Sequence, residues 1–152
     1  MKKYFVVLAL VMLLCLTGCG SKEGKIKCTL SSKDAVNDYS LKSTYTINYK
    51  GDLVETVDTV EEVTSDKSEV LEVFETQLKE TYDKMNKTYG GYKFDVVKKD
   101  NKVTSTVNIN YGKMKMDQLV KDQPSLKNYV KDNKLKVEGL KAMYKSMGAT
   151  CE

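Results

Sequence analysis

Residues 68–91, SEVLEVFETQLKETYDKMNKTYGG, decide the expected fold because their apolar side chains follow the period of an α-helix. The apolar positions recur every three or four residues and would share one helix face; they are Leu71, Phe74, Leu78, Tyr82, Met85 and Tyr89. Asp66 followed by Glu69 fits an N-cap with a capping box. Gly90-Gly91 is typical of a helix end. We therefore predict one long helix with a single buried face.

Strands are expected on both sides of this helix, because the flanking segments alternate apolar and polar residues as a half-exposed β-strand does. The expected strands are residues 26–30, 39–49, 53–63, 92–99 and 102–111. Shorter helical patterns follow at residues 116–120, 124–130 and 137–147. Gly148 should end the last helix and leave residues 149–151 as a tail. The prediction is an α+β fold: an antiparallel sheet with one long helix and shorter C-terminal helices packed on one face.

The first nineteen residues have the features of a lipoprotein signal. Lys2 and Lys3 precede an uncharged apolar run over residues 5–16. This run is about a dozen residues long, whereas a helix needs roughly 20 to span a bilayer. Leu16-Thr17-Gly18-Cys19 follows it and resembles the lipobox of bacterial lipoproteins. In a lipobox the cysteine receives diacylglycerol and becomes the new N-terminus.

These features predict three segments. Residues 1–18 would form the signal peptide, residues 19–24 a lipidated tether, and residues 25–152 a single α+β domain. Lipid attached at Cys19 would hold the domain on the extracytoplasmic face of the cell membrane, since two acyl chains give stable anchoring. The alternative is an ordinary cleaved secretory peptide with a chance cysteine.

Two cysteines remain after processing. Cys15 leaves with the signal peptide and Cys19 carries the lipid, so Cys28 and Cys151 are left as an even pair. An even pair in an exported domain predicts a disulfide. Both cysteines also lie near the ends of the domain, and domain ends are often close in space. Two separate buried thiols are the alternative.

The composition excludes several kinds of chemistry. All 25 basic residues are lysine, because the chain has no arginine, and histidine and tryptophan are also absent. No imidazole can therefore act as a general base or metal ligand, and no guanidinium can bind phosphate in bidentate fashion. No nucleic-acid motif occurs, and export argues against a nucleic-acid partner.

Charge is unevenly distributed along the chain. Residues 52–83 hold 11 carboxylates and 2 lysines, whereas residues 84–145 hold 15 lysines and 6 carboxylates. Such asymmetry can mark an electrostatic binding face. We instead expect the two segments to lie against each other, where their charges largely cancel.

The residues that could form a binding site also have structural roles. The acidic segment could hold a metal through Glu55, Asp58, Glu61, Glu62 and Asp66, but its spacing is not that of an EF-hand and a solvated acidic edge is expected. Most tyrosines should be core residues; those in core-facing positions are Tyr39, Tyr45, Tyr49, Tyr82, Tyr89 and Tyr111. A tyrosine-lined groove for a sugar or peptide is the alternative. We expect no catalytic residues, no cofactor and no metal.

Three short motifs stand out along the chain: Tyr49-Lys50-Gly51-Asp52-x-Val54, Tyr89-Gly90-Gly91, and Asn110-Tyr111-x-Lys113 with Asp117 and Leu119. Together they resemble the YehR-like lipoprotein family of bacteria. The resemblance spans about residues 39–148 and implies an envelope lipoprotein with an α+β domain and no assigned function. Because the chain combines an anchor signal with a compact domain that has no recognisable catalytic group, we expect a non-catalytic domain that binds a protein or small-molecule partner. An accessory role in wall or membrane maintenance is the alternative, and a small hydrolase is a more distant one.

Overall fold

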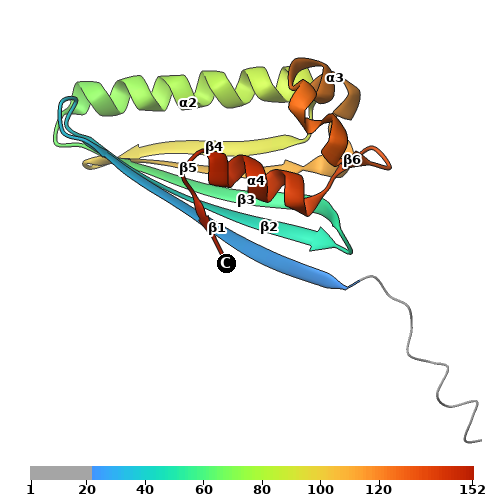
Figure 1. Ribbon diagram of the computed structural model, residues 1–152. Coiled ribbons are helices and arrows are strands. Elements are labelled where there is room, and N and C mark those ends of the chain that lie inside the picture. The colour runs from blue at the N-terminus through green and yellow to red at the C-terminus, as the bar shows by residue number, and fades with distance from the viewer. Residues whose placement is uncertain (1–21) are drawn as a thin grey trace, which may run out of the picture.

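A single twisted sheet is the largest part of the computed structural model, which describes residues 22–152. Within these residues, six antiparallel strands lie in the order β4-β5-β3-β2-β1-β8 (Figure 1). Their bounds are β1 (Glu23–Asp34), β2 (Tyr39–Lys50), β3 (Leu53–Thr64), β4 (Tyr92–Lys99), β5 (Lys102–Asn110) and β8 (Thr150–Cys151). Strands β6 (Val130–Lys131) and β7 (Lys134–Leu135) form a small separate hairpin.

The helices cover one face of this sheet (Figure 1). The long helix α2 (Ser68–Tyr89) connects β3 to β4. The 3-10 turn η1 (Tyr111–Lys113), α3 (Met116–Asp122), the 3-10 helix η2 (Pro124–Tyr129) and α4 (Val137–Ser146) follow β5. The predicted α+β architecture, with helices on one face of an antiparallel sheet, is confirmed.

The N-terminus of α2 differs from the predicted capping box. The helix begins at Ser68 with Lys67 as its N-cap, and no side chain caps it. The Asp66 prediction is therefore wrong. The Ser65 hydroxyl accepts the backbone N–H of Lys67 at 3.1 Å and donates to the Asp38 carbonyl at 2.6 Å, so it holds the chain extended just before the helix.

The C-terminus of α2 depends on the predicted glycine pair. Gly90 has a φ of 72° and Gly91 a φ of 82°, a region that favours glycine. A Cβ on Gly91 would also lie 2.6 Å from the carbonyl oxygen of Asn110. The glycines therefore let the end of α2 pass close to β5.

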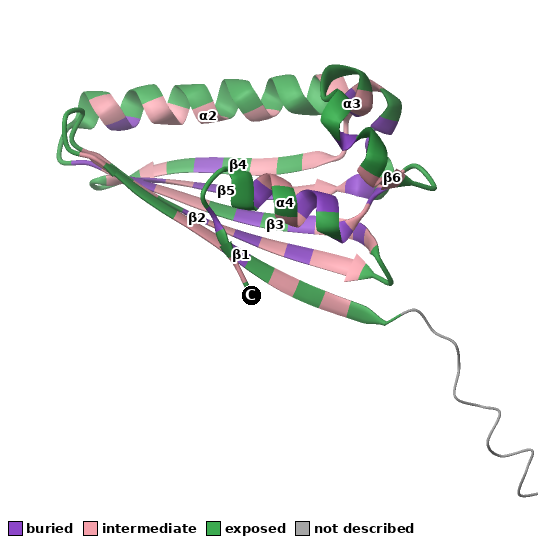
Figure 2. Ribbon diagram, viewed as in Figure 1, coloured by how far each residue is buried: buried purple, intermediate pink, exposed green. Residues whose placement is uncertain are grey.

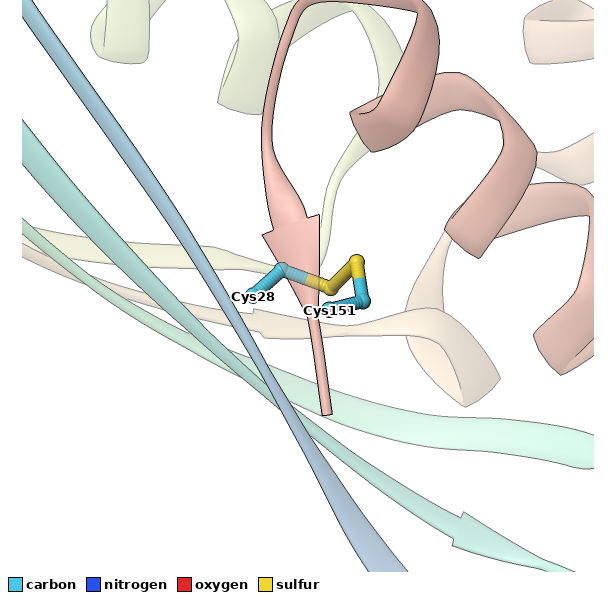
Figure 3. Close-up of a disulfide and its surroundings, with 2 residues drawn as sticks. All are labelled: Cys28 and Cys151. Atoms are coloured by element: carbon cyan, nitrogen blue, oxygen red, sulfur yellow. A yellow bond between two sulfur atoms is a disulfide. The ribbon is translucent and has the colours of Figure 1, made fainter.

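The two ends of the domain are joined by a disulfide. Cys28 of β1 lies opposite Cys151 of β8, and their sulfurs are bonded (Figure 3). Lys27 and Glu152 next to them exchange two backbone hydrogen bonds of 2.9 Å. The predicted pairing is confirmed, and the expected C-terminal tail forms the edge strand β8.

Strand β1 begins at Glu23, before the expected start of the domain at residue 25. Glu23 and Gly24 pair with Lys50 and Tyr49 of β2 and so belong to the sheet.

The core beneath the helices consists of two clusters. The larger cluster lies under the C-terminal helices and includes Ile47, Val57 and Leu140. The smaller cluster lies under the first half of α2 and contains Val63, Leu71, Val96 and Val103. Figure 2 shows α2 mostly exposed, with intermediate positions along it, and Leu71 is its one buried residue. Of the residues predicted for that stripe, Leu71 is fully buried, Phe74, Leu78 and Tyr82 are half-buried, and Met85 is exposed.

The acidic and lysine-rich segments meet in the folded chain, as expected. Four ion pairs join them: Lys98–Glu72 at 2.9 Å, Lys102–Glu62 at 2.8 Å, Lys134–Glu55 at 2.6 Å and Lys131–Asp52 at 3.9 Å. These pairs are largely solvent-exposed, so each contributes little to stability. Their main consequence is that the opposite charges of the two segments partly neutralise each other.

Candidate functional site

A cavity of about 180 Å³ lies between the sheet, the second half of α2 and the C-terminal helices. Apolar and aromatic side chains make up most of its lining, which includes five tyrosines from five different elements: Tyr45, Tyr82, Tyr92, Tyr111 and Tyr144. The exposed side chains of Met85 on α2 and Gln123 after α3 also line it, so the cavity meets solvent between these two elements. An apolar, concave site with a few polar groups is the usual form of a small-molecule site.

A row of polar residues crosses the sheet at this cavity. Ser43 of β2, Glu61 of β3 and Ser105 of β5 are direct cross-strand neighbours, and all three point to the helix-covered face. Glu61 lines the cavity and the two serines flank it. The row separates the larger core cluster from the smaller one.

The two serines are buried without hydrogen-bond partners. Ser43 is 1% exposed and Ser105 is 0% exposed, and neither hydroxyl has a partner in good hydrogen-bond geometry, although Ser43 lies close enough to Tyr45, and Ser105 to Tyr82, to oppose the increase in the pKa of that tyrosine. Leaving a buried hydroxyl unpaired costs about 1–3 kcal/mol. The sheet thus keeps a costly polar strip where a continuous apolar core would be more stable.

Glu61 is the charged group of the cavity. Its Oε2 accepts a hydrogen bond of 2.5 Å from the Tyr82 hydroxyl. Burial raises the pKa of the Glu61 carboxyl, and the Tyr82 hydrogen bond opposes this increase only in part. Burial and the neighbouring Glu61 raise the pKa of Tyr82 far above its ordinary value, so the phenol keeps its proton and acts as the donor.

The remaining tyrosines form the walls. Tyr45 of β2 and Tyr144 of α4 are stacked, with ring centroids 4.2 Å apart and an angle of 18° between the rings. Burial raises the pKa of Tyr92 to about 12 and also raises the pKa of Tyr111 and Tyr144. All these phenols are therefore neutral at physiological pH.

The opening is held together by contacts between α2 and α3. The Tyr89 hydroxyl donates to Asp122 Oδ2 at 3.0 Å, and the backbone N–H of Lys115 donates to the Tyr89 carbonyl at 2.7 Å. Asp122 also accepts hydrogen bonds of 3.0 Å from the Gln118 side chain. The two elements at the opening are thus fixed relative to each other at one end.

The acidic residues considered for a metal do not converge. Strand alternation turns Glu61 toward the helices, while its neighbour Glu62 and Asp58 lie on the outer face. On that face Asp58 accepts hydrogen bonds from Asn48 at 2.9 Å and from Asn108 at 2.7 Å. Among residues 22–152, no group of three or more acidic or cysteine side chains could hold a metal ion.

The structure brings together only some of the predicted tyrosines. Tyr45, Tyr82 and Tyr111 line the cavity, whereas Tyr39, Tyr49 and Tyr89 do not. The sequence pattern did not indicate Tyr92 and Tyr144 for this role, nor Ser43 and Ser105 for the polar row. The sequence did contain one indication of the polar row. In each of the three strands β2, β3 and β5, one position that should face the core is occupied by a polar residue. Cys19, the predicted lipid attachment site, lies outside the described residues.

Replacing Glu61 by glutamine should alter the pH dependence of stability. The pKa of Glu61 is raised from 4.5 in the folded protein, so its favourable contribution is present below the unfolded pKa and lost as pH rises through the folded pKa. Glu61→Gln removes this loss. Its melting temperature should therefore fall less than that of the unmodified protein between about pH 4 and about pH 8.

Glu62→Gln is the matched control for this experiment. Hydrogen bonding and charge from Lys102 lower the pKa of Glu62, so its contribution is present above the unfolded pKa and lost as pH falls. The Glu62→Gln variant should thus lose a little stability at neutral pH. Identical pH profiles for all three proteins would show that Glu61 is not a buried titrating group.

The described chain is thus an α+β domain with one antiparallel sheet, helices on a single face, and an aromatic cavity between them. Two NMR structures share this fold. The YehR protein of E. coli, solved as a structural genomics target, superimposes with a TM-score of 0.54 at 17% identity, over 87% of this chain and 92% of that chain. A protein from Streptococcus pneumoniae TIGR4 superimposes with a TM-score of 0.50 at 13% identity, over 86% of each chain.

These similarities support a YehR-like fold, as the sequence motifs suggested. No protein-family model matches the chain, and no curated protein matches it. In the described part of the chain, no helix is both long enough and apolar enough to cross a membrane.

Proposed function

We propose that this chain is a lipid-anchored envelope protein whose domain binds a small ligand in the tyrosine-lined cavity without transforming it. The observation that carries the proposal is the cavity itself, which the half-buried Glu61 carboxylate lines, with the buried hydroxyls of Ser43 and Ser105 on the neighbouring strands beside it. A buried polar group without a partner lowers the stability of the fold. Proteins usually keep such destabilising groups at functional sites, including sites that bind ligands.

The non-catalytic part of the proposal rests on the polar groups available. Glu61 is the one carboxylate among the described residues that line the cavity. Glycoside hydrolysis by the usual mechanism needs two carboxyl groups flanking the bond. Among the described residues, a lysine that could activate a serine is also absent from the lining.

Ligand binding is preferred to the accessory role. That role would use the lysine-rich surface, but ion pairs to the acidic segment already engage Lys98, Lys102 and Lys134. The cavity, in contrast, is lined by a carboxylate, Glu61, that makes no ion pair with a lysine of the described residues.

A variant at the opening tests whether the cavity binds ligands. Met85 is exposed at the opening, so Met85→Trp should obstruct entry without disturbing the core. We expect a mixture of small metabolites to shift the NMR resonances of Tyr82 and Tyr111, and these shifts should be strongly reduced in Met85→Trp. Val97→Trp, at a similarly exposed site on β4, should leave them unchanged. If no metabolite shifts cavity resonances, or if both variants behave alike, the proposal is wrong.

Lipid anchoring is tested separately through Cys19. Changing Cys19 to serine should abolish lipid attachment and leave unprocessed precursor, because the acylated sulfur is lost. Intact-mass analysis of the membrane fraction measures both effects. A mature protein with an unmodified N-terminus in that fraction would contradict the lipidated form and support ordinary secretion.

A further inference from the structure

The charge of the cavity has one sign. Glu61 is its acidic group, and of the lysines in residues 22–152 none lines it. Within the same residues, no lysine nitrogen lies within 4.0 Å of the Glu61 carboxylate, although neighbouring Glu62 pairs with Lys102 at 2.8 Å. The Glu61 side chain is half-buried, and a carboxylate partly removed from water is stabilised by a cation or by several hydrogen-bond donors beside it. Here its hydrogen-bond partner is the Tyr82 hydroxyl.

The surroundings of Glu61 suit a positive charge. The faces of tyrosine rings are electronegative and attract ammonium groups within about 6 Å, more strongly when water is excluded. Tyr45 and Tyr82 are close enough to Glu61 to interact with its charge, and Tyr92, Tyr111 and Tyr144 line the same space. The neutral phenols add oxygen acceptors but no positive charge.

We propose that the cavity binds a small organic ammonium ion, with its positive nitrogen beside Glu61 and its alkyl part against the tyrosine rings. This inference rests on the proposed function and specifies its ligand class. An anion would meet the Glu61 carboxylate without a compensating lysine. An uncharged sugar would cover the half-buried carboxylate without neutralising it.

The size of the space limits the ligand. A volume of about 180 Å³ admits an ammonium with a few carbon atoms but not a peptide or an oligosaccharide. Met85, Met143 and Leu119 contribute apolar surface to the lining, which fits an alkyl substituent rather than a polyhydroxylated one. Methionine side chains adapt readily to the shape of such a group.

Binding of a cation should depend on pH in a defined direction. The groups that face Glu61 are Tyr82 from α2 and Tyr45 from β2. The pKa values of both phenols are raised from an already high ordinary value, so Glu61 is the first of the three groups to lose its proton as pH rises. An ammonium ion binds the ionised carboxylate, so its affinity should rise as Glu61 loses its proton. An uncharged ligand would show no such increase.

The experiment uses matched pairs of probes with the full-length protein, purified from membranes in a non-ionic detergent. Choline is compared with 3,3-dimethylbutan-1-ol, and n-butylammonium with 1-butanol, because the members of each pair differ mainly in charge. Isothermal titration calorimetry should show at least tenfold tighter binding of one or both cations than of the uncharged partner. Glu61→Gln should remove this preference, and Glu62→Gln should keep it.

The outcomes separate this inference from the proposed function. Equal binding of charged and uncharged probes, or a preference unaffected by Glu61→Gln, would overturn the ammonium assignment. If metabolites shift cavity resonances in the Met85→Trp experiment but neither cation binds, the cavity is a ligand site of another class and only this inference fails. Tighter binding of choline would indicate a quaternary ammonium, and tighter binding of n-butylammonium a primary one.

Discussion

Replacing Cys151 by serine should lower the free energy of unfolding by about 2–5 kcal/mol, the usual cost of losing a native disulfide. The bond joins residues separated by 123 positions, so it closes nearly the whole folded domain into one loop. On the chain-entropy model, a loop of about 100 residues loses about 4.7 kcal/mol of denatured-state freedom. The native state would also lose its covalent hold on β8, which pairs with β1 through two residues only.

The measurement is urea denaturation of residues 22–152 under non-reducing conditions, followed by far-ultraviolet circular dichroism. The double variant Cys28→Ala/Cys151→Ala separates loss of the bond from burial of a hydroxyl, since Cys28 is fully buried and Cys151 only half-buried. Thiol alkylation of the denatured, unreduced protein checks the bond directly. Two reactive thiols, or variants as stable as the unmodified protein, would contradict the proposed contribution of the disulfide to stability.

Alternation of side chains was sufficient to place the main strands. The core-facing residues of β2, Tyr45 and Ile47, alternate with exposed-face threonines in the sequence, and the structure keeps this pattern. The long helix followed in the same way from the spacing of its apolar residues. These patterns are local, so a sequence shows them without knowledge of the strand order.

The errors arose where a residue's role depends on distant partners. Asp66 had the expected spacing for an N-cap, but Ser65 occupies that region with bonds to Lys67 and to the distant Asp38. Strand β8 has two residues, too few for any period, and exists because β1 and the disulfide hold it. Neither contact can be inferred from neighbouring residues alone.

The cavity could be anticipated only in part. Glu61, Ser43 and Ser105 interrupt apolar core-facing positions in their strands, which is visible in the sequence. Their meeting in one row depends on the register of β2, β3 and β5, and β5 returns to β3 after α2 and β4. Because non-local pairing sets that register, the sequence indicated a possible tyrosine-lined groove but not its residues.

Leu71→Ala should cost about 2–5 kcal/mol of stability, as truncation of a fully buried leucine does. Leu71 is 1% exposed and joins α2 to the sheet in the smaller cluster, beside Val63, Val96 and Val103. The loss would include both the transfer of buried methyl groups and the cavity left between helix and sheet. Phe74→Ala and Leu78→Ala should lower the free energy of unfolding by less than truncation of a fully buried side chain does, because both side chains are half-exposed.

Val73→Ala is the matched control on the same helix. Val73 is 53% exposed, so its truncation should change stability by no more than about 0.5 kcal/mol. Alanine also favours helix formation slightly more than valine does, which offsets part of any lost contact. In urea denaturation at the same protein concentration, Leu71→Ala should therefore unfold at a clearly lower urea concentration than Val73→Ala. Equal losses at Leu71 and Val73 would mean that α2 does not pack on the sheet through a single narrow stripe.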